Sequence, residues 1–278
     1  MGGVGDPPFV GALDALSTIY AVSTGRRMRS AYTGPIGNIR STGAGTPNAD
    51  IGYTGANILD TAAAATLIGA DTGVWTTLFD QSGNGINFVQ TSASKQPLYE
   101  ATGFNSKPSA KFDGSDDGMI TSANVPAQST WWGYIVSVAL ATGTAPELWA
   151  LVSFPDSISG YRLFERSLGL NAGQSIYYNN SNGGSSAMIW SNNVNTAHLL
   201  KGAAAVRYAK GSSGTTISDT TNNTIVGGFK STIGYRNDAA LYLNGRIVEV
   251  ALFSGTPTAG QETALWADLN AFWGTPIP

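Results

Sequence analysis

The feature that most constrains this chain is a series of short β-rich segments that fills its second half. Each segment is rich in β-branched and aromatic residues and is bounded by Gly, Ser or Asn. The predicted strands are residues 131–140, 147–154, 161–166, 175–179, 187–190, 203–210 and 229–235. Strands that follow one another without helices between them indicate an antiparallel sandwich rather than βαβ units. An Asn244-Gly245 turn is then expected before a nearly continuous apolar strand, 246–253, at the centre of a sheet.

Helical patterns occur at two places. Residues 59–69 contain an alanine run, with Asp60 or Thr61 as a candidate N-cap and Gly69 where a C-terminal glycine belongs. Residues 259–272 follow a T-x-x-Q capping box formed by Thr258 and Gln261. The predicted fold is therefore all-β, a jelly-roll β-sandwich with two short peripheral helices. Residues 1–16 are expected to form an N-terminal arm and residues 17–278 one jelly-roll domain.

Composition excludes several classes of function. The net charge is −3 and only 12% of residues are charged, so there is no basic footprint for nucleic acid. The chain has no cysteine and one histidine, His198, which is too few ligands for a usual zinc site. No apolar run is long enough to span a membrane, and no secretory signal is visible at the N-terminus. The cluster Arg26-Arg27-Met28-Arg29 is interpreted as structural arginines that bind loop carbonyls and carboxylates.

A polar corner separates two apolar strands between Val74 and Gln90. Its sequence, Asp-Gln-Ser-Gly-Asn-Gly, runs from Asp80 to Gly85. Aspartate and serine side chains can bind nearby backbone N–H groups, and the glycines supply positive φ. Asp80, Ser82 and Asn84 are thus predicted to form a structural corner, and the alternative is a polar site at the rim of a sheet.

A second corner, from Lys111 to Gly118, is rich in aspartate. Asp113, Ser115 and Asp117 imitate the first half of an EF-hand loop, but Asn124 stands where such a loop needs a bidentate glutamate. A plain turn is favoured over a calcium site, so no metal and no cofactor are predicted.

Paired aromatic residues suggest a surface for sugar. Neighbouring residues in a strand point to opposite faces, so Trp131 and Trp132 cannot both enter one core, and neither can the pair that ends in Tyr178. One member of each pair is expected to face outward or into a cleft. The predicted carbohydrate-binding residues are Trp132, Tyr178, Trp190, Tyr235 and Asp238. The alternative is that these aromatics serve core packing or a subunit interface.

Several sequence blocks resemble a known family. The blocks 30–35, 50–51 and 79–85 resemble the N-terminal half of the α-L-arabinofuranosidase B catalytic domain, a retaining glycoside hydrolase. Residues 244–250 and the closing helix resemble the ending of LamG-like, concanavalin-type jelly rolls, and similar blocks recur in phage and bacterial structural proteins. The resemblance implies a concanavalin/LamG-like jelly-roll β-sandwich.

The resemblance also names catalytic candidates. Asp238 stands at the position of the family's acid/base, whereas Ser167 falls where its nucleophilic glutamate would lie, with Glu165 two residues away. Retaining glycosidases need two carboxyl groups about 5–5.5 Å apart. The vicinal cysteine pair that the family places against the sugar has no counterpart in this cysteine-free chain.

The function expected from these observations is that of a non-catalytic jelly-roll protein of a virion. It would be a capsid decoration or a tail adhesion component that attaches to other virion proteins through the N-terminal arm, forms a homo-oligomer and binds cell-surface carbohydrate. The expected location is the virion, with an extracellular location as the alternative. The alternative function is a retaining glycoside hydrolase of the α-L-arabinofuranosidase type, with Asp238 and Glu165 as its carboxyl groups.

Overall fold

The structure is a computed structural model, and the residues that it describes fall in two parts. Residues 10–139 form the first part. The second part comprises residues 148–154, 162–167, 174–179, 185–190, 196–203, 206–211, 216–219, 228, 230–236 and 241–274. For the strands between 148 and 219 only the backbone is described.

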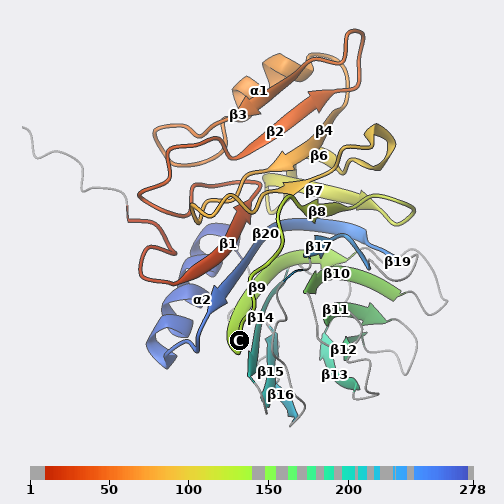
Figure 1. Cartoon of the computed structure of the whole chain (residues 1–278). Helices are drawn as coiled ribbons and strands as arrows, with labels where there is room; N and C mark the ends of the chain where they lie inside the picture. The colour runs from red at the N-terminus through yellow and green to blue at the C-terminus, as the bar shows by residue number, and fades with distance from the viewer. Residues whose placement is uncertain are drawn as a thin grey trace, which may run out of the picture.

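The described residues form β-strands with two α-helices at the periphery (Figure 1). In the first half the strands are β1 Thr18–Ser23, β2 Gly37–Ser41, β3 Asn48–Ile51, β4 Gly73–Leu78, β5 Phe88–Val89, β6 Leu98–Phe104, β7 Lys107–Asp113 and β8 Met119–Thr121. In the second half they are β9 Thr130–Ala139, β10 Leu148–Phe154, β11 Arg162–Ser167, β12 Gln174–Asn179, β13 Ser185–Trp190, β14 Thr196–Ala203, β15 Val206–Gly211, β16 Thr216–Asp219, β17 Thr232–Ile233, β18 Tyr235–Arg236, β19 Leu241–Tyr242 and β20 Asn244–Ser254. The helices are α1 Thr61–Ile68 and α2 Ala259–Trp273, with a short 3-10 turn η1 at Ala93–Lys95.

Two antiparallel runs of strands make up the sandwich. One run has the order β1, β20, β9, β14, β15, β16. The other has the order β3, β2, β4, β5, β8, β17, β10, β11, β12, β13. Strands β6 and β7 join the two runs, because β6 pairs with β4 and β7 pairs with β20. The architecture is the all-β jelly roll that the sequence predicts.

Strands β9 and β20 are buried on both faces. On one face of β9, Trp131 and Ile135 lie in a core cluster together with Trp75 and Phe88. On the other face, Trp132 lies in a second cluster beneath α2. The second cluster also contains the following residues: Leu13, Leu16, Met28, Phe104, Tyr134, Phe253, Leu265, Trp266, Leu269 and Trp273. The apolar character of 246–253 follows from this position, since a strand between two cores has no face in water.

Both predicted helices are confirmed. Helix α1 is capped by Asp60, whose side chain accepts a hydrogen bond from the Ala63 N–H. The capping box of α2 forms as predicted between Thr258 and Gln261. None of the described helices is long and apolar enough to cross a membrane. The boundary of the N-terminal arm at residue 16 stays a prediction, although Leu13 and Leu16 are buried beneath α2.

Two strand predictions need correction. The predicted turn at Asn244-Gly245 is wrong, because Gly245 lies inside β20 and pairs with Phe112 of β7 and Ala139 of β9. Strands β14 and β16 were not among the predicted segments. The β14 sequence, TAHLLKGA, alternates between polar and apolar residues only over its first four positions, and its place beside β9 is set by the tertiary pairing.

The close approach of β9 to β20 generates a test of this core. Gly133 lies where a Cβ atom would be 2.5 Å from the carbonyl oxygen of Ala251, which is backbone and cannot move aside. We expect Gly133→Ala to lower the free energy of unfolding by roughly 1–3 kcal/mol, the usual cost of overpacking. Gly52→Ala is the matched control, because its Cβ atom would have nothing within 4 Å. Urea denaturation of both variants measures the difference, and equal stability would contradict this packing.

Candidate functional site

The polar corner after β4 uses its side chains to bind backbone of the same protein. Asp80 is 4% exposed. Its Oδ1 accepts hydrogen bonds from the N–H groups of Ala21 and Ser82, both at 2.9 Å. Its Oδ2 accepts from Ser82 Oγ at 2.7 Å and from the Ile86 N–H at 3.1 Å. The carboxylate therefore joins the corner to β1 and closes the turn on itself.

Two further side chains of this corner bind the N-terminal strand region. Asn84 Nδ2 donates to the carbonyl oxygens of Thr18 and Ile19 at 3.0 and 2.9 Å. Gln81 is buried; its Oε1 accepts from the Met28 N–H at 2.7 Å and its Nε2 donates to the Arg26 carbonyl at 3.0 Å. The corner thereby positions the segment that follows β1 and carries Arg26.

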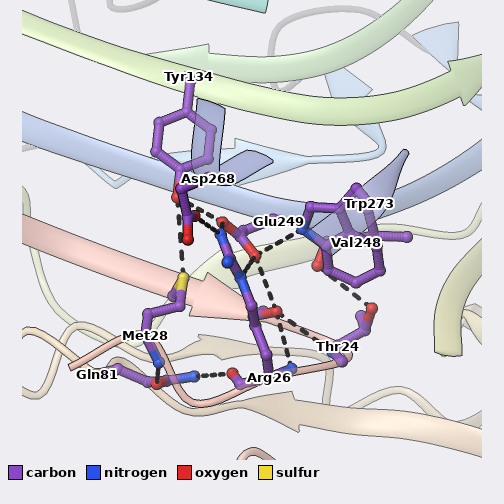
Figure 2. Close-up of polar contacts among 11 residues, drawn as sticks. Thr24, Arg26, Met28, Gln81, Tyr134, Val248, Glu249, Asp268 and Trp273 are labelled. Carbon is purple, nitrogen blue, oxygen red and sulfur yellow. Dashed lines mark hydrogen bonds and ion pairs between the residues drawn. The ribbon is translucent and has the colours of Figure 1, made fainter. Parts of the chain in front are cut away.

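Arg26 forms a buried ion pair with Glu249 of β20 (Figure 2). The contact is bidentate, with Nε 2.8 Å from Oε2 and Nη2 2.8 Å from Oε1. Glu249 also accepts hydrogen bonds from Tyr134 Oη at 2.6 Å and from Trp273 Nε1 at 2.8 Å. Burial alone would raise the pKa of Glu249, but the charge of Arg26 and these hydrogen bonds outweigh it and hold that pKa below its usual value.

The position of Glu249 follows from an irregularity in β20. The register between β20 and β9 shifts between Ile247 and Glu249. Ile247 lies in the core cluster between the layers, whereas Val248 already lies in the cluster beneath α2. This bulge places Glu249 on the α2 side, where Tyr134 and Trp273 reach it.

A second carboxylate approaches Arg26 from α2. Asp268 Oδ2 lies 2.6 Å from Arg26 Nη2, although the pair is not aligned as a hydrogen bond. The guanidinium carbon of Arg26 also lies 4.7 Å from the centroid of the Phe272 ring. Arg27 donates to the carbonyl oxygens of Arg29 and Ser30. The interpretation of this cluster as structural arginines is confirmed.

The aspartate-rich corner forms a closed turn. Asp113 Oδ1 accepts from the Ser115 N–H at 2.8 Å and the Asp116 N–H at 3.2 Å, and Asp117 Oδ2 accepts from the Asp113 N–H at 3.1 Å. Carboxylate oxygens of the three aspartates lie within 4.8 Å of one another, so they are the described group that could hold a cation such as calcium. Burial, followed by the charges of Asp113 and Asp116, raises the pKa of Asp117 to about 7.

A tyrosine pair lies next to this corner. Tyr235 and Tyr242, on the paired strands β18 and β19, have ring centroids 6.2 Å apart and an interplanar angle of 21°. A Cβ atom at Gly118 would lie 2.2 Å from Tyr235 Cδ1, so the tyrosine ring packs directly on the Gly118 backbone. Tyr235 is only partly buried. The aspartates of the corner and this aromatic pair thus belong to one end of the molecule.

The other predicted sugar-binding and catalytic residues fall in different places. Trp132 is 3% exposed and stacks on Phe253 with centroids 4.2 Å apart, so it packs inside the protein and not outward. The backbone of Glu165 pairs with Tyr177, and that of Tyr178 pairs with Ser186. The backbone of Trp190 pairs with Gln174 at the end of β13. The side chains of Glu165, Tyr178 and Trp190, and the whole of Asp238, lie outside the described residues.

Sequence reasoning missed the groups that gather around Arg26. Asp268 and Phe272 lie on one face of α2, and the 3.6-residue period of the helix was available as a signal for that face. No sequence signal connects α2 with Arg26, since these segments are more than two hundred residues apart.

Comparisons with known proteins give a likeness of fold. No protein-family model matches the sequence, and a search of curated proteins found no match. A mutant GH54 α-L-arabinofuranosidase soaked with 4-nitrophenyl α-L-arabinofuranoside is similar in structure, with a TM-score of 0.71 and 17% identity. An arabinofuranosidase complexed with arabinofuranosyl-α-1,2-xylobiose has a TM-score of 0.69 and the same identity. Both likenesses cover 92% of this chain and 64% of the other chain.

A weaker likeness extends to a toxin domain. The botulinum neurotoxin serotype G binding domain has a TM-score of 0.50 at 10% identity, covering 87% of this chain and 54% of that one. At these identities the likenesses establish a shared β-sandwich fold.

The buried ion pair generates the first prediction from this site. Glu249→Gln removes the buried carboxylate that binds Arg26 through two hydrogen bonds and leaves only Asp268, among the described residues, to compensate its charge, so we expect a loss of roughly 3–5 kcal/mol in the free energy of unfolding. The control is Glu100→Gln, which breaks the partly exposed pair with Arg246 and is expected to cost about 1 kcal/mol or less. Chemical denaturation measures both, and a similar cost for the two variants would argue against a buried charge network.

Asp117 generates a prediction about pH. Its folded-state pKa of about 7 lies above the unfolded value, so its contribution to stability is present at low pH and declines as the pH rises from about 4 to about 7. Asp117→Asn keeps an acceptor for the Asp113 N–H without the charge. We expect this variant to be more stable than the wild type at high pH by on the order of 1 kcal/mol, with the difference shrinking toward low pH.

Thermal unfolding across this pH range, in the presence of a chelator, measures the effect of Asp117. The chelator is needed because a bound cation would stabilise the charged form. Asp71→Asn, the same replacement at an exposed position, is the control. A variant that is less stable than the wild type at high pH would contradict the raised pKa.

Proposed function

We propose that this protein is a carbohydrate-binding β-sandwich that acts as a virion component without cleaving the sugar. The observation that carries the proposal is the likeness to α-L-arabinofuranosidase structures over 92% of the chain. The names of those structures include an arabinofuranoside and an arabinofuranosyl-xylobiose. We therefore propose pentose-containing glycans as the first class of ligand to test.

The binding face that we propose lies at the end formed by β18, β19 and the aspartate-rich corner. Tyr235 offers a partly exposed aromatic ring, and sugar C–H groups pack on such rings while hydroxyl groups bind nearby polar atoms. Carboxylates of the corner next to Gly118 supply acceptors. Asp238 follows β18 closely in sequence and is included in the proposed face.

The absence of cleavage is proposed from the carboxyl groups. Glu249 is 1% exposed and is enclosed by Arg26, Tyr134 and Trp273, so it cannot reach a substrate. Asp113 and Asp117 of the corner bind the backbone of their own turn through their carboxylates. Ser167 stands where the resemblance places the nucleophile, and the cysteine pair of that family has no counterpart.

The role in a virion is proposed from composition. The chain has no cysteine and a low share of charged residues, and Gly, Ser, Thr and Asn provide its polar surface. In this proposal the protein is a homo-oligomer whose N-terminal arms contact other virion proteins. The face at the β18–β19 end binds cell-surface glycan. Sedimentation of the protein with purified particles tests this part; a free monomer that binds neither particles nor glycans would contradict it.

The second candidate function is a retaining arabinofuranosidase, favoured by the same structural likeness. Incubation with 4-nitrophenyl α-L-arabinofuranoside separates the two candidates, because release of nitrophenol requires cleavage whereas binding alone does not. We expect no release above that of a Glu165→Gln, Asp238→Asn double variant. Release that depends on these two carboxyl groups would establish the enzyme instead.

Binding by the proposed face is tested with arabinoxylan oligosaccharides and isothermal titration calorimetry. We expect Tyr235→Ser to weaken binding by about tenfold, or ~1.4 kcal/mol, because it removes the aromatic surface. Tyr32→Ser is the control, since Tyr32 is also a partly buried tyrosine that packs on a glycine, Gly34, but lies between β1 and β2. Equal affinity of the two variants would move the binding face away from Tyr235.

A further inference from the structure

A pocket of about 290 Å³ opens beside the buried ion pair, on the α2 side of the molecule. Its polar walls are Arg26, Arg27, Asn57 and Asp268. Phe272 and small apolar side chains, among them Ala271, complete the lining. Ligand pockets in proteins occupy roughly 300–1,000 Å³, so this one suits a single sugar-sized ring rather than a longer chain. It is separate from the face proposed for Tyr235, which lies at the β18–β19 end.

The lining carries hydrogen-bonding atoms that have no partner among the described residues. Arg26 has a side chain that is 7% exposed; its Nε and Nη2 bind Glu249, and its Nη1 has no partner within the described part of the chain. Asn57 Oδ1 accepts from Arg27, while Asn57 Nδ2 has no described partner. Asp268 directs Oδ2 toward Arg26, and its Oδ1 has no described partner either. Two donors and one carboxylate acceptor are thus left for a ligand.

The two groups that carry a spare donor and a spare acceptor lie side by side. Asp268 Oδ2 is 2.6 Å from Arg26 Nη2, and Figure 2 shows the carboxylate of Asp268 next to the guanidinium of Arg26. A ligand that binds both groups must accept a hydrogen bond from the guanidinium and donate one to the carboxylate. A vicinal pair of hydroxyl groups does this, because each hydroxyl is both a donor and an acceptor.

Charged groups of both signs lie at the pocket. Arg26 and Arg27 are positive, Asp268 and the buried Glu249 that pairs with Arg26 are negative, and Lys107 Nζ lies 5.4 Å from the centroid of the Phe272 ring. An anion would lie beside Asp268 and a cation beside the arginines, so either would meet a like charge on losing its hydration, whereas a neutral ligand would not. Phe272 and Ala271 provide an apolar wall for the C–H groups of a ring.

We propose that this pocket binds the vicinal diol of a neutral pentose or hexose. Arg26 Nη1 and Asn57 Nδ2 donate to the hydroxyl oxygens, Asp268 Oδ1 accepts from one hydroxyl, and the ring lies against Phe272. The buried Glu249 holds the Arg26 guanidinium in place, so the donor is oriented before the sugar arrives. This site is independent of the binding face proposed above.

The test uses the full chain and ligand-observed NMR titration with three probes: methyl α-L-arabinofuranoside, methyl β-D-xylopyranoside and methyl α-D-glucopyranoside. We expect saturable binding of at least one probe and no binding of its fully O-methylated derivative, which cannot donate. Ala271→Trp fills the pocket from an exposed helix position, and we expect it to weaken binding by at least about tenfold. Ala267→Trp, one turn earlier and outside the lining, is the matched control and is expected to bind as the wild type does.

A second variant tests the donor without filling space. Asn57→Asp retains the acceptor for Arg27 and replaces the spare donor by an oxygen, so it is expected to weaken sugar binding as well. The proposal is overturned if no probe shows saturable binding, if the O-methylated derivative binds equally, or if Ala271→Trp binds as tightly as Ala267→Trp. Tyr235→Ser is expected to leave this binding intact, and loss of all binding in that variant would assign the sugar to the other face and overturn this site.

Discussion

The arrangement of this protein depends on a charge that has been taken out of water. An isolated guanidinium in a low-dielectric interior is strongly destabilising, and a buried pair is tolerated only when its remaining hydrogen bonds are made. Arg26 meets Glu249, and Glu249 in turn receives Tyr134 of β9 and Trp273 of α2. Because these groups come from separate segments, the requirement to satisfy one carboxylate fixes the segment after β1, the central strands and the closing helix relative to one another.

The bulge in β20 makes this arrangement compatible with a sandwich. A regular strand that placed Ile247 in the core between the layers would also point Glu249 there, because side chains two residues apart share a face. The register shift between Ile247 and Glu249 reverses the alternation, so that the carboxylate points toward α2. The same strand thereby supplies both cores, and both cores remain free of an uncompensated charge.

Sequence patterns predicted the helices and strands of this fold better than they predicted which elements pack against one another. Thr258 and Gln261 identify the start of α2, and the apolar run 246–253 identifies a strand buried on both faces, because capping and apolar composition are local properties. The strand alternation makes Trp132 a candidate for sugar binding or for packing, and the packing alternative holds because α2 covers that face of β9. No residue near Trp132 in the sequence indicates that a helix will cover it. The approach of Asp268 to Arg26 was equally hidden, since it results from the packing of distant segments.

The polar groups around Asp80 and those around Arg26 differ in how many of their hydrogen-bonding atoms have partners within the protein. Asp80 accepts hydrogen bonds on both oxygens from its own corner and from β1, so its presence is explained by the fold. Arg26 binds Glu249 and forms an ion pair with Asp268, and both Arg26 and Asp268 keep a polar atom at a pocket without a partner in the described part of the chain. Burying the Arg26 guanidinium to more than nine-tenths while its Nη1 has no described partner costs free energy. Packing does not explain this cost, because two apolar residues of similar volume in place of a buried ion pair are often at least as stable. A ligand that makes hydrogen bonds to the spare atoms of Arg26 and Asp268 would offset this energetic cost. The buried guanidinium therefore favours a binding role for the α2 side of the sandwich.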